Sequence, residues 1–294
     1  MIITGHRGAL GTEPENTLRS FRRAVADGCD EIELDLRVSA DGELVIMHDA
    51  TVDRTTSGSG EVASLTLAQL RALDAGLGEQ VPTWAETVAA VDVRIQAEIK
   101  AESAVPLLAQ SLKSDPALAA RTLVTSFHPE ILLAIREAFP DVTTGHIFGR
   151  TPDIPDVITR TRAAHATWAL CGITGLTPAG VSELHAAGLS ATAWPVPDPE
   201  TLATAVALGV DGITTDNPHL LTSPPPRPHR PTPPTPAHTA RPGSTLSTRQ
   251  PFRRDENGWW APKVQSVAGD QAVQHRAPSP PPEVASAGGT CSNV

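Results

Sequence analysis

With 294 residues and a formal net charge of −10, the chain can form one large domain or two medium ones, and nucleic acid is not expected as its main partner. Its three widely separated cysteines exclude a disulfide framework and a zinc–cysteine site. No apolar run approaches the roughly 20 residues that a membrane span requires, so we expect no stable membrane insertion and a cytoplasmic location.

Composition divides the chain near residue 222. Residues 223–294 hold 15 of the 28 prolines, and their formal charge is +4 against −14 for residues 1–222. A segment so poor in apolar side chains cannot bury enough surface to offset the entropy of ordering, so we predict a disordered Pro-rich tail. This tail is either an arm that binds partners through polyproline II segments or an extension without a function. The sequence identifies no partner for it.

The first third of the domain begins with a strand, a helix and an acidic second strand. Residues 1–4 are a short apolar strand, and Asn16 is the expected N-cap of the helix that follows. In residues 31–37 apolar and charged side chains alternate with period two, which is typical of a strand. This alternation puts Glu33 and Asp35 on the same face, where two buried carboxylates would require a metal ion or a catalytic role.

A hairpin is predicted directly after the acidic strand. The turn residues 39–42 lead into a returning arm, residues 43–49, which brings His48 back beside Asp35. Residues 50–83 are irregular apart from one short helix. We interpret them as a small insertion that forms a lobe over the site.

Helices and strands alternate from residue 84 to residue 216. After the first two strands, further strands are expected at residues 93–99, 122–127, 143–148, 166–170, 189–194 and 211–216. Eight strands separated by helices predict an α/β fold of the TIM (β/α)8 barrel type. The alternative, an open doubly wound sheet, normally carries a G-x-G-x-x-G loop after its first strand, and residues 5–8 do not have this pattern.

Polar residues gather where the predicted strands end, and in a TIM barrel this rim carries the active site. They are His6, Arg7, Glu33, Asp35, His48, Glu98, Lys100 and Trp194. Three carboxylates suit a hard divalent cation, Mg²⁺ or Ca²⁺. The two imidazoles suit acid/base catalysis at phosphorus, and the two cationic side chains can neutralise phosphate oxygens.

Each of these residues also has a purely structural interpretation. Glu98 and Lys100 fit a plain ion pair at a strand end, and a single histidine is usually a hydrogen-bonding group. Trp194 fits packing at the barrel rim as well as a substrate contact. Their convergence on one face of the barrel favours catalysis over structure.

Short motifs stand in a characteristic order along residues 1–221. They are GHRG at 5–8, PENT at 14–17, ELD at 33–35, DG at 41–42, HD at 48–49, RTT at 54–56, EIK at 98–100 and GVDGITTD at 209–216. In this order and spacing the chain resembles the glycerophosphodiester phosphodiesterase family. The resemblance implies a TIM barrel with an insertion after the HD motif.

The resemblance also implies an activity and a set of roles. The activity is the hydrolysis of small-molecule glycerophosphodiesters to glycerol 3-phosphate and an alcohol, with a divalent metal. The implied roles are acid/base catalysis for His6 and His48, metal binding for Glu33, Asp35 and Glu98, and phosphate contacts for Arg7 and Lys100.

Two alternatives use the same site. One is a lysophospholipase D-like hydrolysis of lysolipids, which would need an apolar path for an acyl chain. The other is an inactive scaffold that binds phosphate or metal, and the complete set of motif residues argues against it. The run at residues 194–197, Trp-Pro-Val-Pro, lacks the asparagine that family members often have there, so the resemblance does not carry over a polar substrate contact at this run.

Overall fold

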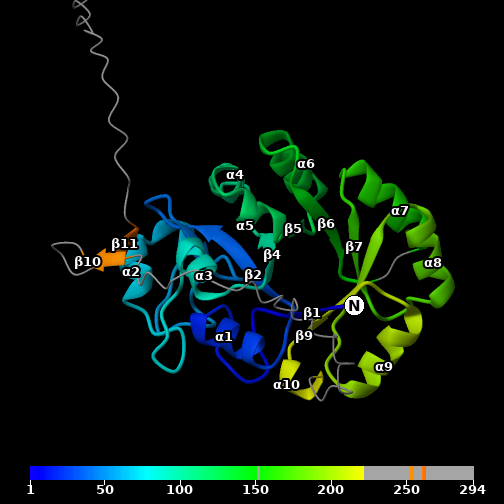
Figure 1. The fold of residues 1–294 in the computed structure, drawn as a ribbon, viewed down its shortest axis with the longest axis horizontal. Helices are drawn as coiled ribbons and strands as arrows, with labels where there is room; N and C mark the ends of the chain where they lie inside the picture. Colours follow the sequence, from blue (N-terminus) through cyan, green and yellow to red (C-terminus); the bar gives the residue numbers. More distant parts are fainter. Residues whose placement is uncertain (151–152, 222–251, 255–259, 263–294) are drawn as a thin grey trace, which may run out of the picture. The chain divides into compact units, whose positions relative to one another are not determined.

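Eight parallel strands close into a barrel in the first part of the protein (Figure 1). The computed structural model describes residues 1–150, 153–221, 252–254 and 260–262. The barrel strands are β1 (Ile2–Gly5), β2 (Glu31–Val38), β4 (Arg94–Ile99), β5 (Thr122–Ser126), β6 (Thr143–Phe148), β7 (Trp168–Gly172), β8 (Ser190–Trp194) and β9 (Gly212–Thr215). Their order is β1-β9-β8-β7-β6-β5-β4-β2, and the pairing of β1 with β2 closes the ring. The predicted TIM barrel is therefore confirmed, and the open sheet is excluded.

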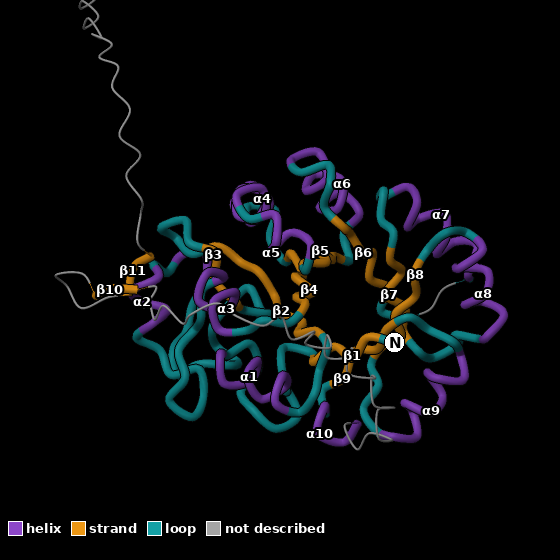
Figure 2. The backbone as a smooth tube through the Cα atoms, viewed as in Figure 1, coloured by secondary structure: helices purple, strands orange, loops and turns teal. Residues whose placement is uncertain are grey.

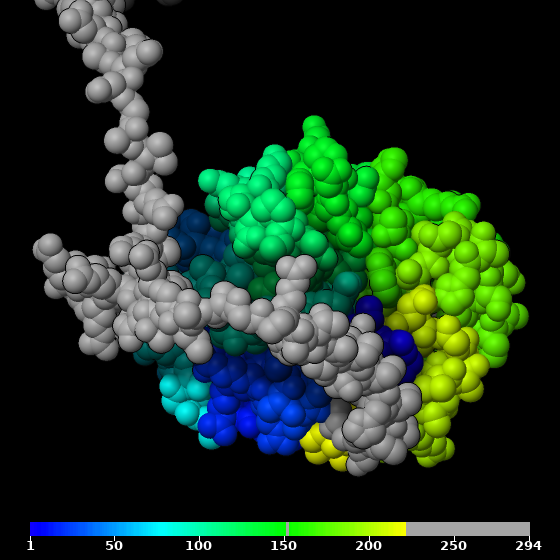
Figure 3. All heavy atoms as spheres, viewed as in Figure 1, coloured from blue at the N-terminus to red at the C-terminus, as the bar shows by residue number. Residues whose placement is uncertain are grey.

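Helices between the strands form the outer shell of the barrel (Figure 2). They are α1 (Leu18–Ala26), α3 (Trp84–Ala90), α4 (Ala104–Ser114), α5 (Pro116–Ala120), α6 (Pro129–Ala138), α7 (Ile154–Ala163), α8 (Pro178–Ala186), α9 (Pro199–Leu208) and α10 (Pro218–Leu221). In the space-filling view the green and yellow parts of the chain pack closely against one another on the face that is seen (Figure 3).

Several local predictions differ from the structure. The short helices α5 and α10 were not predicted, because four or five residues are too few for a helical period to show. Strand β7 begins at Trp168 rather than at residue 166. The backbone N–H of Ala166 still donates to the carbonyl of Thr161, so the turn that ends α7 extends into the predicted strand.

The two faces of β2 have opposite chemistry. Ile32, Leu34 and Leu36 are fully buried in the core between the barrel and its helices. Because side chains alternate across a strand, Glu33 and Asp35 point the other way, into the barrel. They are only 2% and 1% exposed, so the predicted burial of both carboxylates is confirmed.

The start of α1 differs from prediction by one residue. Thr17 is the N-cap: its backbone is extended (φ −112°, ψ 158°), and its hydroxyl accepts a hydrogen bond from the N–H of Ser20. Asn16, which we expected to cap the helix, lies in the left-handed region with φ 58°. That conformation turns its side chain away from the helix, and its amide donates to Asp35 at 2.7 Å.

The predicted hairpin and insertion are present. Strand β3 (Leu44–Ile46) pairs antiparallel with the end of β2. Residues 50–83 contain a 3₁₀ turn η1 (Val62–Ser64) and the helix α2 (Leu67–Arg71). They enclose a small core of their own beside the barrel, in which Val52 and Leu70 are fully buried.

The second compact unit, residues 231–294, is described only as two strands. Strands β10 (Phe252–Arg254) and β11 (Trp260–Pro262) pair antiparallel. The rest of the predicted tail, residues 223–294, lies outside the described residues, so its disorder and the boundary at residue 222 stay predictions. Among the helices that the structure describes, none is both long and apolar enough to cross a membrane.

Two glycines with similar backbone angles should differ in their tolerance of alanine. Gly8 (φ +83°) has no room for a methyl group, since a Cβ would lie 2.4 Å from Ser20 Oγ and 2.6 Å from Ser20 C. Gly42 (φ +87°) has nothing within 4 Å of that position. Gly42→Ala should cost about 1–2 kcal/mol of unfolding free energy for the left-handed backbone alone. Gly8→Ala should cost clearly more, because the backbone of α1 must also shift. Urea denaturation of both variants measures the difference, and equal costs would show that the close packing of Gly8 is unimportant.

Candidate active site

Three buried carboxylates meet at the mouth of the barrel. Glu33 and Asp35 come from β2 and Glu98 comes from β4, where Asp35 and Glu98 are direct partners across the two strands. One oxygen of each residue lies within 4.8 Å of one oxygen of each of the others. The structure therefore brings together the three residues that the sequence pointed to as a metal-binding group.

Two cations lie directly against these carboxylates. Lys100 Nζ is 2.6 Å from Glu98 Oε1 and 3.2 Å from Asp35 Oδ1. Arg7 has a left-handed backbone (φ 48°), which lets its N–H donate to Glu33 Oε2 at 2.8 Å while its Nε lies 3.5 Å from Asp35 Oδ2. Both residues were expected to contact a phosphate, and in this structure both balance the carboxylates.

The electrostatics of the cluster suit a divalent cation. Burial, together with the negative charge of Asp35, raises the pKa of Glu33 to about 8. Burial also raises the pKa of Glu98, and Lys100 offsets only part of this effect. Asp35 Oδ1 is buried and accepts no hydrogen bond, although Lys100 is close to it. A hard cation bound by oxygen ligands would satisfy this oxygen and stabilise the charged carboxylates.

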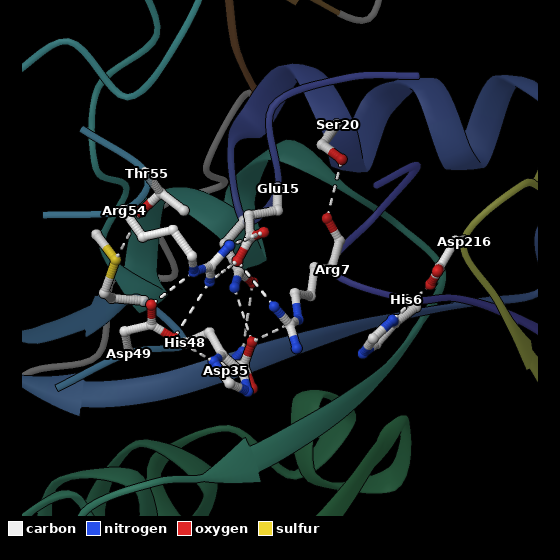
Figure 4. A network of polar contacts seen from close by, with 12 residues as sticks. His6, Arg7, Glu15, Ser20, Asp35, His48, Asp49, Arg54, Thr55 and Asp216 are labelled. Carbon is white, nitrogen blue, oxygen red and sulfur yellow. Dashed lines mark hydrogen bonds and ion pairs between the residues drawn. The ribbon is translucent and has the colours of Figure 1, made fainter. Parts of the chain in front are cut away.

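Each predicted catalytic histidine is paired with an aspartate through Nδ1 (Figure 4). His6 Nδ1 lies 2.6 Å from Asp216 Oδ1, and His48 Nδ1 lies 2.6 Å from Asp49 Oδ1. Such a contact fixes the orientation of the ring and leaves Nε2 as the nitrogen available to a substrate. This arrangement is compatible with the predicted acid/base role, which stays a prediction.

The two imidazoles have opposite pKa shifts. Burial lowers the pKa of His6, but the hydrogen bond to Asp216 and the charge of Glu33 outweigh it, so the net pKa is raised. For His48, burial dominates over the hydrogen bond to Asp49, and the net pKa is lowered. Two groups whose environments separate their proton affinities can divide the roles of acid and base.

An arginine of the insertion connects both sides of the site (Figure 4). Arg54 donates two hydrogen bonds to the carboxylate of Glu15, both at 2.8 Å, and its Nε donates to Asp49 at 2.6 Å. Glu15 also accepts from Arg7 Nη1 at 2.9 Å. Arg54 and Glu15 therefore form a bridge that orients both Arg7 and the Asp49–His48 pair.

Sequence reasoning missed the contacts of several residues at the site. They are Glu15, Asn16, Asp49, Arg54 and Asp216. All of them lie inside the motifs that carry the family resemblance, so the signal was present. Their pairing depends on contacts between distant segments, which a motif does not specify.

The barrel mouth also has an apolar side, away from the carboxylate cluster. Phe127, Ile147, Leu170 and Trp194 line a cavity of about 30 Å³ that His6 and Glu33 border from the charged side. The indole of Trp194 is held by a hydrogen bond from Nε1 to the carbonyl of Leu170 at 3.3 Å. Its ring meets that of Phe127 edge to face, with 6.0 Å between centroids. Trp194 thus lies at the mouth where we predicted it, on the apolar side.

The fold and the mouth together define a TIM-barrel enzyme with an acidic, histidine-flanked site. The family model described as the Glycerophosphoryl diester phosphodiesterase family matches residues 6–220. The chain therefore belongs to this family, and the prediction of an enzyme that hydrolyses glycerophosphodiesters is confirmed at the level of the family.

Curated relatives that are named glycerophosphodiester phosphodiesterases align with this chain over most of their length. A glycerophosphodiester phosphodiesterase of Caldanaerobacter subterraneus subsp. tengcongensis is 31% identical over 237 residues, which cover 75% of this chain and 96% of the relative. Glycerophosphodiester phosphodiesterase 1 of Homo sapiens is 30% identical over 232 residues, with 65% of this chain and 70% of the relative covered.

Solved structures agree with the fold. A phosphodiesterase of Oleispira antarctica, solved in complex with the product sn-glycerol-3-phosphate, is 26% identical with a TM-score of 0.69, and the match covers 74% of this chain and 94% of that one. A structure from Galdieria sulphuraria is 29% identical with a TM-score of 0.68, and the match covers 75% of this chain and 95% of that one.

Metal binding should release a proton and strengthen as the pH rises. Because the pKa of Glu33 is raised to about 8, this carboxyl is mostly protonated at neutral pH, and a cation must displace its proton. The affinity for Mg²⁺ or Ca²⁺ should therefore increase from about pH 6 to about pH 8 and then level off. Calorimetry in buffers of different ionisation enthalpy should detect close to one proton released per ion at about pH 7.

Glu33→Gln is the matched variant for this prediction. It should bind the cation more weakly and lose most of the pH dependence, since the titrating ligand is gone. A wild-type affinity that stays constant across the same pH range would contradict the prediction.

Removal of the Arg54 bridge should impair catalysis more than folding. Arg54→Ala frees Glu15 and Asp49, so Arg7 and His48 lose their fixed orientation, and kcat/KM should fall by up to about 10²-fold. Arg71→Ala is the control: Arg71 lies in the same insertion and pairs with Glu86, away from the catalytic residues. Steady-state kinetics with parallel urea denaturation compares the two variants. Equal kinetic losses in both would show that Arg54 acts only through general stability.

Proposed function

We propose that this site hydrolyses glycerophosphodiesters to glycerol 3-phosphate and an alcohol, with Mg²⁺ or Ca²⁺ held by Glu33, Asp35 and Glu98. One observation carries the proposal. Three buried carboxylates and two aspartate-paired histidines share the mouth of a barrel that belongs to a phosphodiesterase family. The glycerol 3-phosphate bound to the Oleispira antarctica relative supports this product class.

The chain's own residues supply charge and proton transfer. When bound, the metal would act as a Lewis acid toward the phosphoryl group. Arg7 and Lys100 already lie at the carboxylates, and they can turn to neutralise the oxygens of a diester that enters the mouth.

The two histidines act through Nε2 as an acid/base pair. One imidazole accepts the proton of the attacking water, and the other donates a proton to the leaving alkoxide. Asp216 and Asp49 stabilise whichever ring is protonated and keep each Nδ1 engaged. We assign the acid/base couple to His6 and His48 without fixing which ring has which role.

The direct test is turnover of a small diester by the full-length protein. With glycerophosphocholine and Mg²⁺ or Ca²⁺, glycerol 3-phosphate should form, and chelation of the metal should stop its release. His6→Ala and His48→Ala should each lower kcat by at least about 10²-fold, the low end for an acid/base residue. Coupled detection of glycerol 3-phosphate measures both effects.

A histidine–aspartate pair at the other end of the barrel provides the control. His185 Nε2 lies 2.9 Å from Asp211, which directly precedes β9. His185→Ala should leave kcat unchanged. No product from any diester with either metal would overturn the proposal. Preferential turnover of a lysophospholipid in direct competition would favour the lysophospholipase D-like alternative.

A further inference from the structure

The cavity lined by Phe127, Leu170 and Trp194 beside His6 and Glu33, here called the lumen cavity, is too small for either arm of a diester. Its volume is about 30 Å³, far below the roughly 300–1,000 Å³ of small-molecule sites. On the side of the insertion, a cavity bordered by Glu15, Asn16 and Thr55 measures only about 10 Å³. A substrate held with its phosphate at the carboxylates must therefore place one arm elsewhere on the mouth.

A larger cavity opens on the same rim beyond Trp194. Its volume is about 400 Å³, which is within the usual range for small-molecule sites. It is lined by Gly149, Arg150, Gly172, Thr174 and Trp194, together with other residues after the ends of β6, β7 and β8. In a TIM barrel, segments that follow the strand ends carry the active site.

The large cavity adjoins the lumen cavity at two points. Trp194 lines both of them. A Cβ on Gly149, which lines the large cavity, would lie 3.8 Å from Phe127 Cε1, which lines the lumen cavity. The two cavities are therefore neighbours at Trp194.

Close backbone packing forms part of the cavity wall. A Cβ on Gly172 would lie 3.1 Å from both Arg150 Cα and Gly149 O, so the loops after β6 and β7 touch there without an intervening side chain. Apart from the indole of Trp194, the polar side chains among the described lining residues are those of Arg150 and Thr174, and both residues are exposed.

The charge of this cavity is opposite to that of the reaction centre. Among its described lining residues there is an arginine and no carboxylate. A quaternary ammonium is usually recognised by several aromatic faces. Here Trp194 is the one aromatic residue among the described lining, and it stands beside a positive charge. Hydroxyl and carboxylate oxygens, in contrast, can accept hydrogen bonds from both Arg150 and Thr174.

We propose that this cavity binds the alcohol headgroup of the diester and selects headgroups rich in hydroxyl or carboxylate oxygens over quaternary ammonium headgroups. The inference rests on the proposed function, because it assigns a subsite to the same reaction. Arg150 is its specificity-determining residue. Arg150 lines this cavity and does not belong to the carboxylate and histidine cluster.

A competition assay tests the selectivity. Glycerophosphoglycerol and glycerophosphocholine are mixed in one reaction, so that the ratio of the released alcohols gives the ratio of the two kcat/KM values. The wild-type protein should prefer glycerophosphoglycerol. Arg150→Glu should shift the ratio toward glycerophosphocholine by about fivefold, the factor for an exposed charge pair of ~1 kcal/mol. Higher salt should reduce the shift, because exposed charges are screened.

Arg22→Glu is the matched control, since it makes the same charge change at an exposed position of α1, on the outer shell. It should leave the ratio as in the wild type. An unchanged ratio in Arg150→Glu, or an equal shift in Arg22→Glu, would overturn the headgroup subsite while leaving the phosphodiesterase function intact. A wild-type protein that hydrolyses no diester would instead overturn the proposed function, and the subsite with it.

Discussion

The site depends on the burial of three carboxylates at one end of the barrel. Leaving a buried charge without a partner costs roughly 3–5 kcal/mol, so Glu33, Asp35 and Glu98 require compensation from their surroundings. In the described structure, Lys100 and the backbone and side chain of Arg7 provide it. These contacts compensate the buried charge only in part, since the pKa of Glu33 stays raised. The barrel thus holds a group of oxygens whose charge a cation can complete.

The loops around the mouth also help to balance and orient the charged groups. The PENT segment supplies Glu15 and Asn16, one binding Arg7 and the other binding Asp35. The insertion supplies Arg54, whose two carboxylate partners come from different parts of the chain. The left-handed backbone at Arg7 and Asn16 is unfavourable by itself. It persists because these surrounding contacts orient both residues toward the carboxylates.

The sequence predicted those parts of the site that follow from local periodicity. Alternation in residues 31–37 placed Glu33 and Asp35 on one face, and the turn at residues 39–42 placed His48 near them. The contact between His6 and Asp216 was not predictable in this way, because the two residues are 210 positions apart and meet only when β9 closes against β1. Asn16 was assigned to a helix cap because local preference could not reveal that Asp35 competes for its amide.

The two halves of the barrel mouth have different chemistry, which suits the two parts of a diester under the proposed function. Strands β1, β2 and β4 contribute charged groups to the reaction centre, whereas β5 to β8 contribute apolar walls and the rim beyond Trp194. Under the proposed function, a bound cation together with Arg7 and Lys100 would draw a phosphate to the charged half, because burying its charge against Phe127 or Leu170 would be costly. The orientation of the diester then follows from the asymmetry of the barrel. In the proposed complex its phosphorus lies at the two histidines, and one arm crosses the apolar wall toward Arg150.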